Sequence, residues 1–130
     1  MLRIGTTVIG VDDVGRAYRF WQAALGYRPR HAEPAPEVDW VILDPPDGTG
    51  ASIALGLSDT PAQSRPRLHL DLYAGDAADQ AQEVERLVAL GAQRVAWSDY
   101  PPDADFVVLA DTEGNRFCVI DTSVPPPPMS

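Results

Sequence analysis

An internal repeat of about 60 residues is the sequence feature that most restricts how this chain can fold. Thr6 lies seven residues before Asp13, and His69 lies seven residues before Asp76. Each aspartate is a candidate N-cap, with Asp12 as an alternative in the first half, for a segment whose apolar residues follow helical spacing. Each segment ends in Leu-Gly, where a C-cap glycine belongs. The repeat therefore predicts two similar halves within one domain.

Each half predicts the order strand, helix, strand, strand, strand. In the first half, the expected strands are Ile4–Val11, Val38–Leu43 and Ser52–Leu57. The apolar face of the expected helix consists of Val14, Ala17, Tyr18, Trp21, Ala24 and Leu25. The second strand is weak there, because the prolines of Arg28–Glu37 disfavour regular structure. In the second half, the expected strands are Leu68–Tyr73, Arg94–Trp97, Phe106–Leu109 and Arg116–Ile120. The apolar face of the expected helix consists of Ala81, Val84, Leu87, Val88 and Leu90.

The predicted fold is α+β, with two βαβββ repeats that form an open barrel around a central cleft. A four-stranded sheet with one covering helix buries only one face, so two such units can meet through their free sheet faces. We place the domain at residues 1–123 and the repeats at about 3–58 and 66–122. Residues 124–130 contain four consecutive prolines and predict an extended or disordered tail.

Charge and composition exclude several classes of function. The net charge is −9 and all ten basic residues are arginine, so an acidic surface argues against nucleic-acid binding. No apolar run approaches the roughly 20 residues of a membrane span, and the first residues do not resemble a signal peptide. The single cysteine, Cys118, rules out an intrachain disulfide and indicates a reducing compartment. We expect a cytoplasmic protein.

The stretch Arg67–Asp76 alternates apolar and polar residues, which is typical of a half-buried strand. Its leucines fall on one face, whereas His69, Asp71 and Tyr73 fall on the other. Such a row of polar groups is either exposed to solvent or forms the wall of a pocket.

Several motifs together resemble the vicinal oxygen chelate superfamily, which includes glyoxalases, bleomycin-resistance proteins and extradiol dioxygenases. The resemblance covers about Arg3 to Thr122 and is specific for the fold rather than for a reaction. It rests on Val11-Asp12-Asp13, Ala17-Tyr18-Arg19-Phe20-Trp21, Leu25-Gly26-Tyr27, His69-Leu70-Asp71-Leu72, Glu83–Leu87, Leu90-Gly91-Ala92 and Asp111–Cys118. It also implies a homodimer, in which sheets are often completed between chains.

The resemblance implies that metal ligands, usually His, Gln or Glu, would come from the first and last strand of each repeat. Thr6, His69 and Cys118 stand at three of these positions, and Gly48–Leu57 offers no Asp, Glu, His or Cys. Only His69 fits the family pattern, and a catalytic metal needs about three protein ligands. We therefore expect no metal cofactor, although His69, Asp71 and Cys118 remain an alternative set of ligands for a divalent ion such as zinc.

Other roles for these residues remain open. His69 and Asp71 are candidates for an acid–base pair, because a carboxylate can tune an imidazole near neutral pH; alternatively, they only satisfy each other's hydrogen bonds. Cys118 is a weaker candidate for a nucleophile. Arg116 shares its face and is a candidate partner for an anionic ligand or for a rim salt bridge.

The first hypothesis is a glyoxalase-like protein that lacks the usual metal ligands and binds a small organic molecule, in a sequestering or accessory role. The alternative is a lyase or isomerase of the same superfamily that uses His69 and Asp71, with or without a divalent metal. A third possibility is an interaction module without small-molecule function. The residues expected to bind the ligand are Thr6, Trp40, His69, Asp71, Tyr73, Phe106, Arg116 and Cys118. For Trp40, core packing is an equally good interpretation.

Overall fold

The chain folds into two compact units, each with one helix and one four-stranded sheet. The structure is a computed structural model and describes residues 1–125. Unit 1 is Met1–Ala62 and unit 2 is Gln63–Ser130, so the boundary falls in the segment that separates the two sequence repeats. Each unit has the order βαβββ, which confirms the predicted α+β class.

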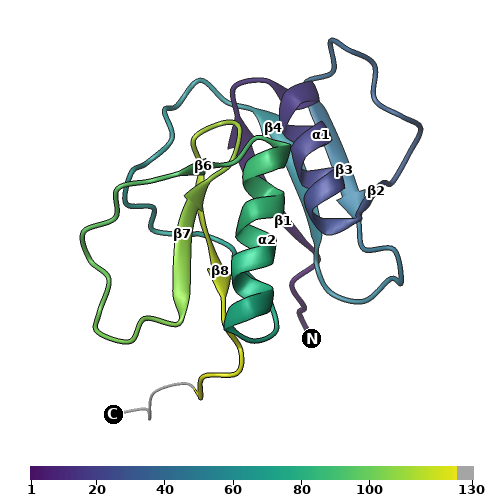
Figure 1. The fold of residues 1–130 in the computed structure, drawn as a ribbon. Coiled ribbons are helices and arrows are strands. Elements are labelled where there is room, and N and C mark those ends of the chain that lie inside the picture. Colours follow the sequence, from purple (N-terminus) through teal and green to yellow (C-terminus); the bar gives the residue numbers. More distant parts are fainter. Residues whose placement is uncertain (126–130) are drawn as a thin grey trace. The chain divides into compact units, whose positions relative to one another are not determined.

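Unit 1 forms a mixed sheet with the strand order β1-β4-β3-β2 (Figure 1). Strand β1 runs parallel to β4, whereas the other neighbours are antiparallel. Its elements are β1 (Thr6–Val11), α1 (Val14–Leu25), β2 (Arg28–Pro29), β3 (Trp40–Asp44) and β4 (Ser52–Leu57).

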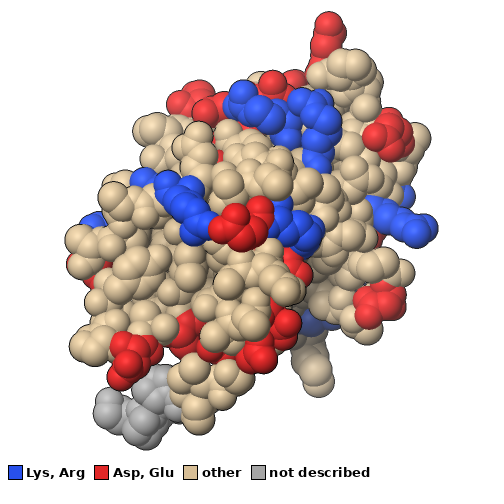
Figure 2. Space-filling model, viewed as in Figure 1, with Lys and Arg blue, Asp and Glu red and all other residues tan. Residues whose placement is uncertain are grey.

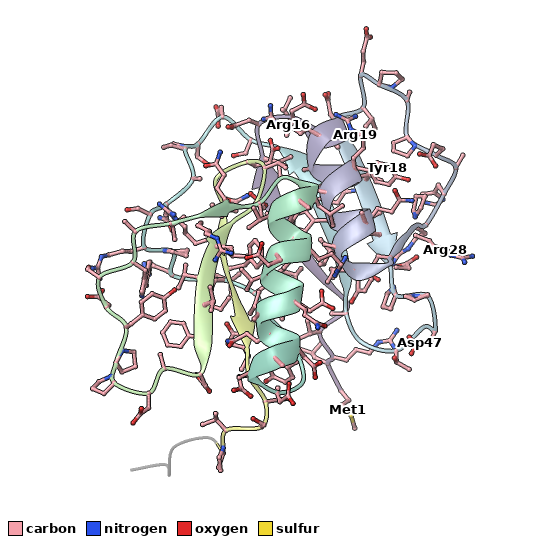
Figure 3. All side chains as sticks on the ribbon, viewed as in Figure 1. Met1, Arg16, Tyr18, Arg19, Arg28 and Asp47 are labelled. Carbon is pink, nitrogen blue, oxygen red and sulfur yellow. The ribbon has the colours of Figure 1, made fainter. Side chains whose placement is uncertain are left out.

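Helix α1 begins and ends where the sequence predicts. The carboxylate of Asp13 accepts a 3.0 Å hydrogen bond from the backbone N–H of Arg16, and Gly26 closes the helix with φ 68°. Trp21 and Phe20 are almost completely buried, although the predicted apolar face does not include Phe20. Arg16 and Arg19 are exposed, whereas Tyr18 is buried (Figure 3).

Unit 2 repeats this topology in the strand order β5-β8-β7-β6. Its first strand is again parallel to its last strand, and the remaining pairs are antiparallel. Its elements are β5 (Asp71–Tyr73), α2 (Ala77–Leu90), β6 (Gln93–Arg94), β7 (Phe106–Ala110) and β8 (Arg116–Ile120).

Helix α2 covers one face of the unit 2 sheet. Asp76 and Asp79 form a capping box, in which each side chain accepts a hydrogen bond from the other's backbone N–H. Val84 and Leu87 are buried, as is Phe117 of β8. Ala81 and Leu90, which were predicted to belong to the apolar face, are exposed.

The first strand of unit 2 is shorter than predicted. A strand from Leu68 was expected, but β5 begins at Asp71, and Leu68 is 76% exposed. The start of the neighbouring strand limits its length, because Asp71 pairs with Cys118 and β8 begins just two residues earlier, at Arg116. Residues before His69 therefore have no strand beside them, and an unpaired edge segment is not stable as a strand.

The strand predicted at Arg94–Trp97 is also shorter, because β6 contains only Gln93 and Arg94. Beyond this pair the edge of β7 finds another partner: the backbone N–H of Val108 donates a 2.8 Å hydrogen bond to the hydroxyl of Tyr100. The loop after β6 thus satisfies a backbone group that a longer strand would otherwise have satisfied.

Within residues 1–125, the structure contains no helix long and apolar enough to cross a membrane. Carboxylate and guanidinium side chains both lie on the face seen in Figure 2. The predicted proline-rich tail, 124–130, lies outside the described residues except for its first two positions.

Candidate functional site

The face of the unit 2 sheet that α2 leaves uncovered carries polar and apolar groups in cross-strand rows. Register places Asp71 beside Cys118, and Cys118 beside Val108. In the next row, Tyr73 lies beside Ile120, which lies beside Phe106. Because side chains alternate along a strand, all of these residues point to the face opposite Phe117 and α2.

This face forms a pocket with a volume of about 720 Å³. All of the residues that line it belong to unit 2. Six residues predicted to bind a ligand are among them: His69, Asp71, Tyr73, Phe106, Arg116 and Cys118. The structure thus brings together, on one wall, residues from three strands and the segment before β5.

Two predicted residues, Thr6 and Trp40, belong to unit 1 and do not line this pocket. Thr6 is exposed on β1. Trp40 is 48% exposed and lies against Gly56, so closely that a Cβ atom at position 56 would come within 2.9 Å of its ring. Their roles in ligand binding stay predictions.

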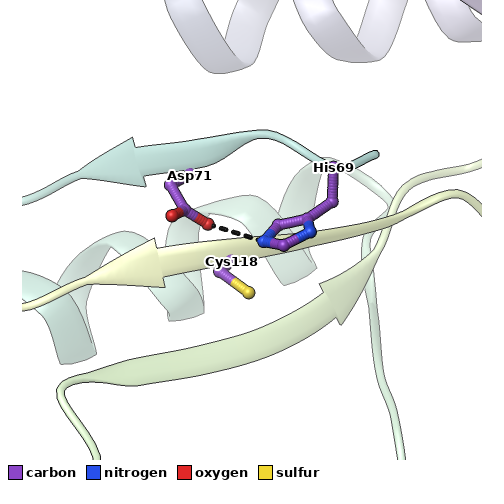
Figure 4. Close-up of side chains that lie close together, drawn as sticks. All are labelled: His69, Asp71 and Cys118. Carbon is purple, nitrogen blue, oxygen red and sulfur yellow. Dashed lines mark ion pairs between the residues drawn. The ribbon is translucent and has the colours of Figure 1, made fainter. Parts of the chain in front are cut away.

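His69, Asp71 and Cys118 form the polar centre of the pocket (Figure 4). Nε2 of His69 lies 3.1 Å from Oδ1 of Asp71, and their side chains are 42% and 47% exposed. Cys118 is 8% exposed. The polar row predicted from alternation is therefore a partly open wall, with the thiol at its base.

The thiol of Cys118 stays protonated at neutral pH. Burial raises the pKa of Cys118 to about 11, and the neighbouring Asp71 carboxylate adds to the shift through its charge and a hydrogen bond. Thiolate, not thiol, is the nucleophilic form of cysteine. Burial and the neighbouring carboxylate therefore oppose a nucleophilic role for Cys118 and favour its protonated form as a hydrogen-bond donor to Asp71.

Some members of the superfamily that this chain resembles depend on a metal ion, so the side chains at the ligand positions are compared with those that a divalent ion needs. In unit 1, the positions that correspond to His69 and Cys118 hold Thr6 and Ala54; a hydroxyl is a poor ligand for a divalent ion and a methyl group is none, so a four-ligand set does not fit. In unit 2, one ligand atom each from His69, Asp71 and Cys118 lies within 4.8 Å of the others. This N, O and S set suits zinc in type, and an ion held by it would replace the contact between Nε2 of His69 and Asp71.

Several polar or aromatic residues that line the pocket were not predicted, among them Arg65, Trp97, Asp105 and Asp121. The Arg65 guanidinium lies 5.7 Å from the centre of the Trp97 ring and forms an ion pair with Asp99. These contacts join two loops more than 30 residues apart, and no sequence periodicity reports such contacts. Asp105 and Asp121 flank β7 and β8, and only the strand register shows that they reach the pocket.

Phe106 is fixed by an aromatic contact. Its ring centre lies 5.2 Å from that of Tyr100, and the planes are tilted by 35°. Tyr100 is in turn hydrogen-bonded to Val108. Tyr73, in contrast, is 79% exposed. Phe106 is therefore a positioned part of the pocket, whereas Tyr73 lies at its open edge.

The family follows from comparison with known proteins. The model of the glyoxalase-like domain family matches residues 6–120. The chain belongs to this family, and therefore to the vicinal oxygen chelate superfamily. No curated protein matches the sequence significantly.

Solved structures with the same fold include three from bacteria. A glyoxalase-related enzyme from Fulvimarina pelagi has 21% identity and a TM-score of 0.70, with 97% of this chain and 92% of that chain covered. A glyoxalase/bleomycin resistance protein/dioxygenase family enzyme from Burkholderia phytofirmans has 17% identity and a TM-score of 0.71, covering 92% and 98%. A fosfomycin resistance protein from Mesorhizobium loti has 20% identity and a TM-score of 0.61, covering 92% and 90%. At these identities the likeness concerns the fold alone.

Proposed function

We propose that this chain binds a small organic molecule in the unit 2 pocket and that binding needs no metal ion, as in a sequestering or accessory protein. The observation that carries the proposal is the pocket itself: a volume of about 720 Å³ on an uncovered sheet face. Small-molecule sites have volumes of roughly 300–1,000 Å³ and combine apolar walls with a few converging polar groups. Phe106, Val108 and Ile120 supply apolar wall, and His69 and Asp71 supply polar groups.

Two features support binding without a metal. Nε2 of His69 lies 3.1 Å from Oδ1 of Asp71, so the imidazole already has a polar partner. Cys118 holds its proton at neutral pH, and a thiol must lose that proton to become a metal ligand. An ion held by these side chains would therefore replace the contact between His69 and Asp71 and release the Cys118 proton.

The test is a fragment screen by thermal shift in EDTA, followed by calorimetric titration of the fragments that respond. Responses of equal size in EDTA and in zinc support the proposal; a response that needs a divalent ion, or stoichiometric metal in the purified protein, contradicts it. His69→Ala should weaken binding several-fold. His31→Ala is the matched control, because His31 is the other histidine of the chain and is exposed in unit 1.

A second candidate function is acid–base catalysis of a lyase or isomerase type, favoured by the 3.1 Å contact between His69 and Asp71. When Nε2–H donates to the carboxylate, Nδ1 carries the lone pair that can take a proton from a bound substrate. Asp71 would hold this tautomer and stabilise the imidazolium that forms.

The two functions differ in what happens to a bound fragment. Incubation of carbonyl-containing fragments from the screen in D₂O, followed by NMR, reports exchange of protons next to the carbonyl. Exchange that exceeds the solvent rate and is lost in His69→Ala, but not in His31→Ala, supports catalysis. Binding without any enhanced exchange supports the sequestering role.

We further propose that the protein is a homodimer, which light scattering after size-exclusion chromatography checks directly. A role as an interaction module without small-molecule function predicts a pocket filled by side chains. The open volume in unit 2 favours ligand binding over that role.

A further inference from the structure

The charged groups of the pocket differ in whether they already have a partner. Asp71 contacts His69, and Arg65 forms an ion pair with Asp99. The carboxylate of Asp121 accepts hydrogen bonds from the backbone N–H and the hydroxyl of Ser123, at 2.9 and 2.6 Å. These groups are engaged before any ligand enters.

Arg116 is the exception among the basic residues that line the pocket. It is the first residue of β8, shares the pocket face with Cys118, and is half-buried. Its Nε is buried and has no hydrogen-bond partner within residues 1–125. A buried polar group without a partner destabilises the fold, and more so when it is charged, so such a group is usually completed by water or a ligand.

The register separates Arg116 from two of the acidic groups. Arg116 pairs with Ala110 at one end of the β7–β8 ladder, whereas Asp105 and Asp121 lie together beyond its other end, joined by a 2.7 Å backbone hydrogen bond. Five residues of strand correspond to roughly 17 Å. Apolar side chains, among them Phe106, occupy the space between. The pocket thus has a cationic end at Arg116 and an acidic end at Asp105 and Asp121, and both apolar side chains and the polar group of His69, Asp71 and Cys118 lie between the two ends.

Building on the proposed function, we propose that the ligand of this pocket is a small organic acid with a single carboxylate. The Arg116 guanidinium binds the carboxylate, and the apolar body of the ligand lies along Val108, Phe106 and Ile120. An arginine fork matches a carboxylate in geometry and can donate two parallel hydrogen bonds. A single negative charge suits the site better than a dianion, because Asp71, Asp105 and Asp121 line the same pocket and repel additional negative charge.

Three probes with one carbon skeleton test this inference: 4-phenylbutyrate, 4-phenylbutanamide and 4-phenylbutylamine. They carry an anionic, a neutral and a cationic end group. Calorimetric titration in EDTA at low salt should show at least tenfold tighter binding of the acid than of the amide. The preference should weaken as salt is added, because a partly exposed ion pair is screened.

Substitutions of the two arginines of the pocket show which of them produces the preference for the acid. Arg116→Gln should remove the preference for the acid, because it weakens binding of the acid more than binding of the amide, and Arg116→Lys should restore part of the preference through charge alone. Arg65→Gln is the matched control, because Arg65 lines the same pocket but is already paired with Asp99. It should keep the preference. Thermal melting of each variant checks that it is folded.

Three results would overturn the inference: equal binding of acid and amide, tighter binding of the amine, or a preference that survives Arg116→Gln. If none of the probes binds while neutral fragments respond in the EDTA screen, the inference fails and the proposed function stands. If the screen also gives no response, both fail.

Discussion

The two units share a topology but differ on the sheet face that their helix leaves uncovered. Both sheets place the last strand between the first and the third, and both place the second strand at an edge. In unit 1 the uncovered face carries Thr6 beside Ser52 and Val8 beside Ala54. The corresponding positions of unit 2 hold His69, Arg116, Asp71 and Cys118.

The sheet residues and helix residues that pack against each other are, in contrast, apolar in both units. Trp21 and Leu55 in unit 1, and Phe117 and Leu109 in unit 2, are all nearly inaccessible to solvent. This layer must stay apolar, because it supplies most of the stability of each unit. The uncovered face is not needed for packing against the helix, so its chemistry can differ between repeats. This difference supports unit 2 as the place of the proposed ligand site.

The largest expected effect tests whether both helix-facing layers support the fold equally. Trp21→Ala and Phe117→Ala each remove a large side chain that is 1% exposed. Each should lower the free energy of unfolding by about 3–5 kcal/mol, from lost burial and the cavity left behind. Chemical denaturation measures this. A loss below about 1 kcal/mol in one unit would show that its helix is not packed as described.

The next effect concerns the thiol that unit 2 places where unit 1 has Ala54. With a pKa of about 11, Cys118 should react with iodoacetamide at pH 7 roughly two orders of magnitude more slowly than a free cysteine of pKa about 8.5. The rate should climb toward pH 11. Asp71→Asn should lower the pKa and speed the reaction, because it removes the neighbouring negative charge. A rate at pH 7 equal to that of free cysteine would contradict the assignment.

The raised pKa of Cys118 also makes the free energy of unfolding depend on pH. The folded state holds the Cys118 proton more tightly than the unfolded chain does, because the pKa is raised on folding. The stabilisation is therefore complete below the unfolded pKa and is lost as the pH rises toward about 11. Cys118→Ser should flatten this part of the stability profile.

A smaller difference is expected between the helix caps. Asp13→Ala removes the hydrogen bond to the Arg16 N–H and should cost about 1 kcal/mol. Asp76→Ala should cost more, up to about 2 kcal/mol, because Asp79 loses its reciprocal partner in the capping box. Thermal melting of the two variants ranks them. Equal losses would mean that the capping box adds nothing.

The smallest effect belongs to an ion pair of unit 1. Two hydrogen bonds from Arg30, at 2.9 and 3.0 Å, hold the pKa of Asp44 at about 2, with help from the Ser52 hydroxyl. The pair is 43% and 34% exposed, so solvent screens it and Asp44→Asn should destabilise less than either cap substitution. Its contribution is present above the ordinary carboxyl pKa and is lost as the pH falls toward 2. Acid titration of stability, in wild type and Asp44→Asn, measures it.

Much of the fold could be predicted from local signals. Asp13 and Gly26 mark the ends of α1 because caps depend on a few neighbouring residues. The β8 strand, Arg116–Ile120, has the predicted bounds. The early start predicted for β5 is wrong, because the pattern from Leu68 onward cannot report where the neighbouring strand begins. Alternation of apolar and polar residues predicts which face of the sheet a side chain occupies, whereas pairing with the neighbouring strand determines the length of the strand.

The site could be predicted only in part, for a related reason. Alternation placed His69 and Asp71 on one face, and the parity of β8 added Arg116 and Cys118. The engaged state of Arg65, and the unpartnered Nε of Arg116 within residues 1–125, depend on contacts between segments distant in the sequence. Such contacts leave no periodic pattern.

The most direct test of the central claim, metal-free ligand binding in unit 2, is a two-dimensional ¹H–¹⁵N NMR titration in EDTA with a fragment from the thermal-shift screen. We expect shifts concentrated in residues 69–73, 106–108 and 116–120, with β1 and β4 of unit 1 little changed. Shifts confined to the unit 1 sheet, or shifts that appear only after zinc is added, would contradict it.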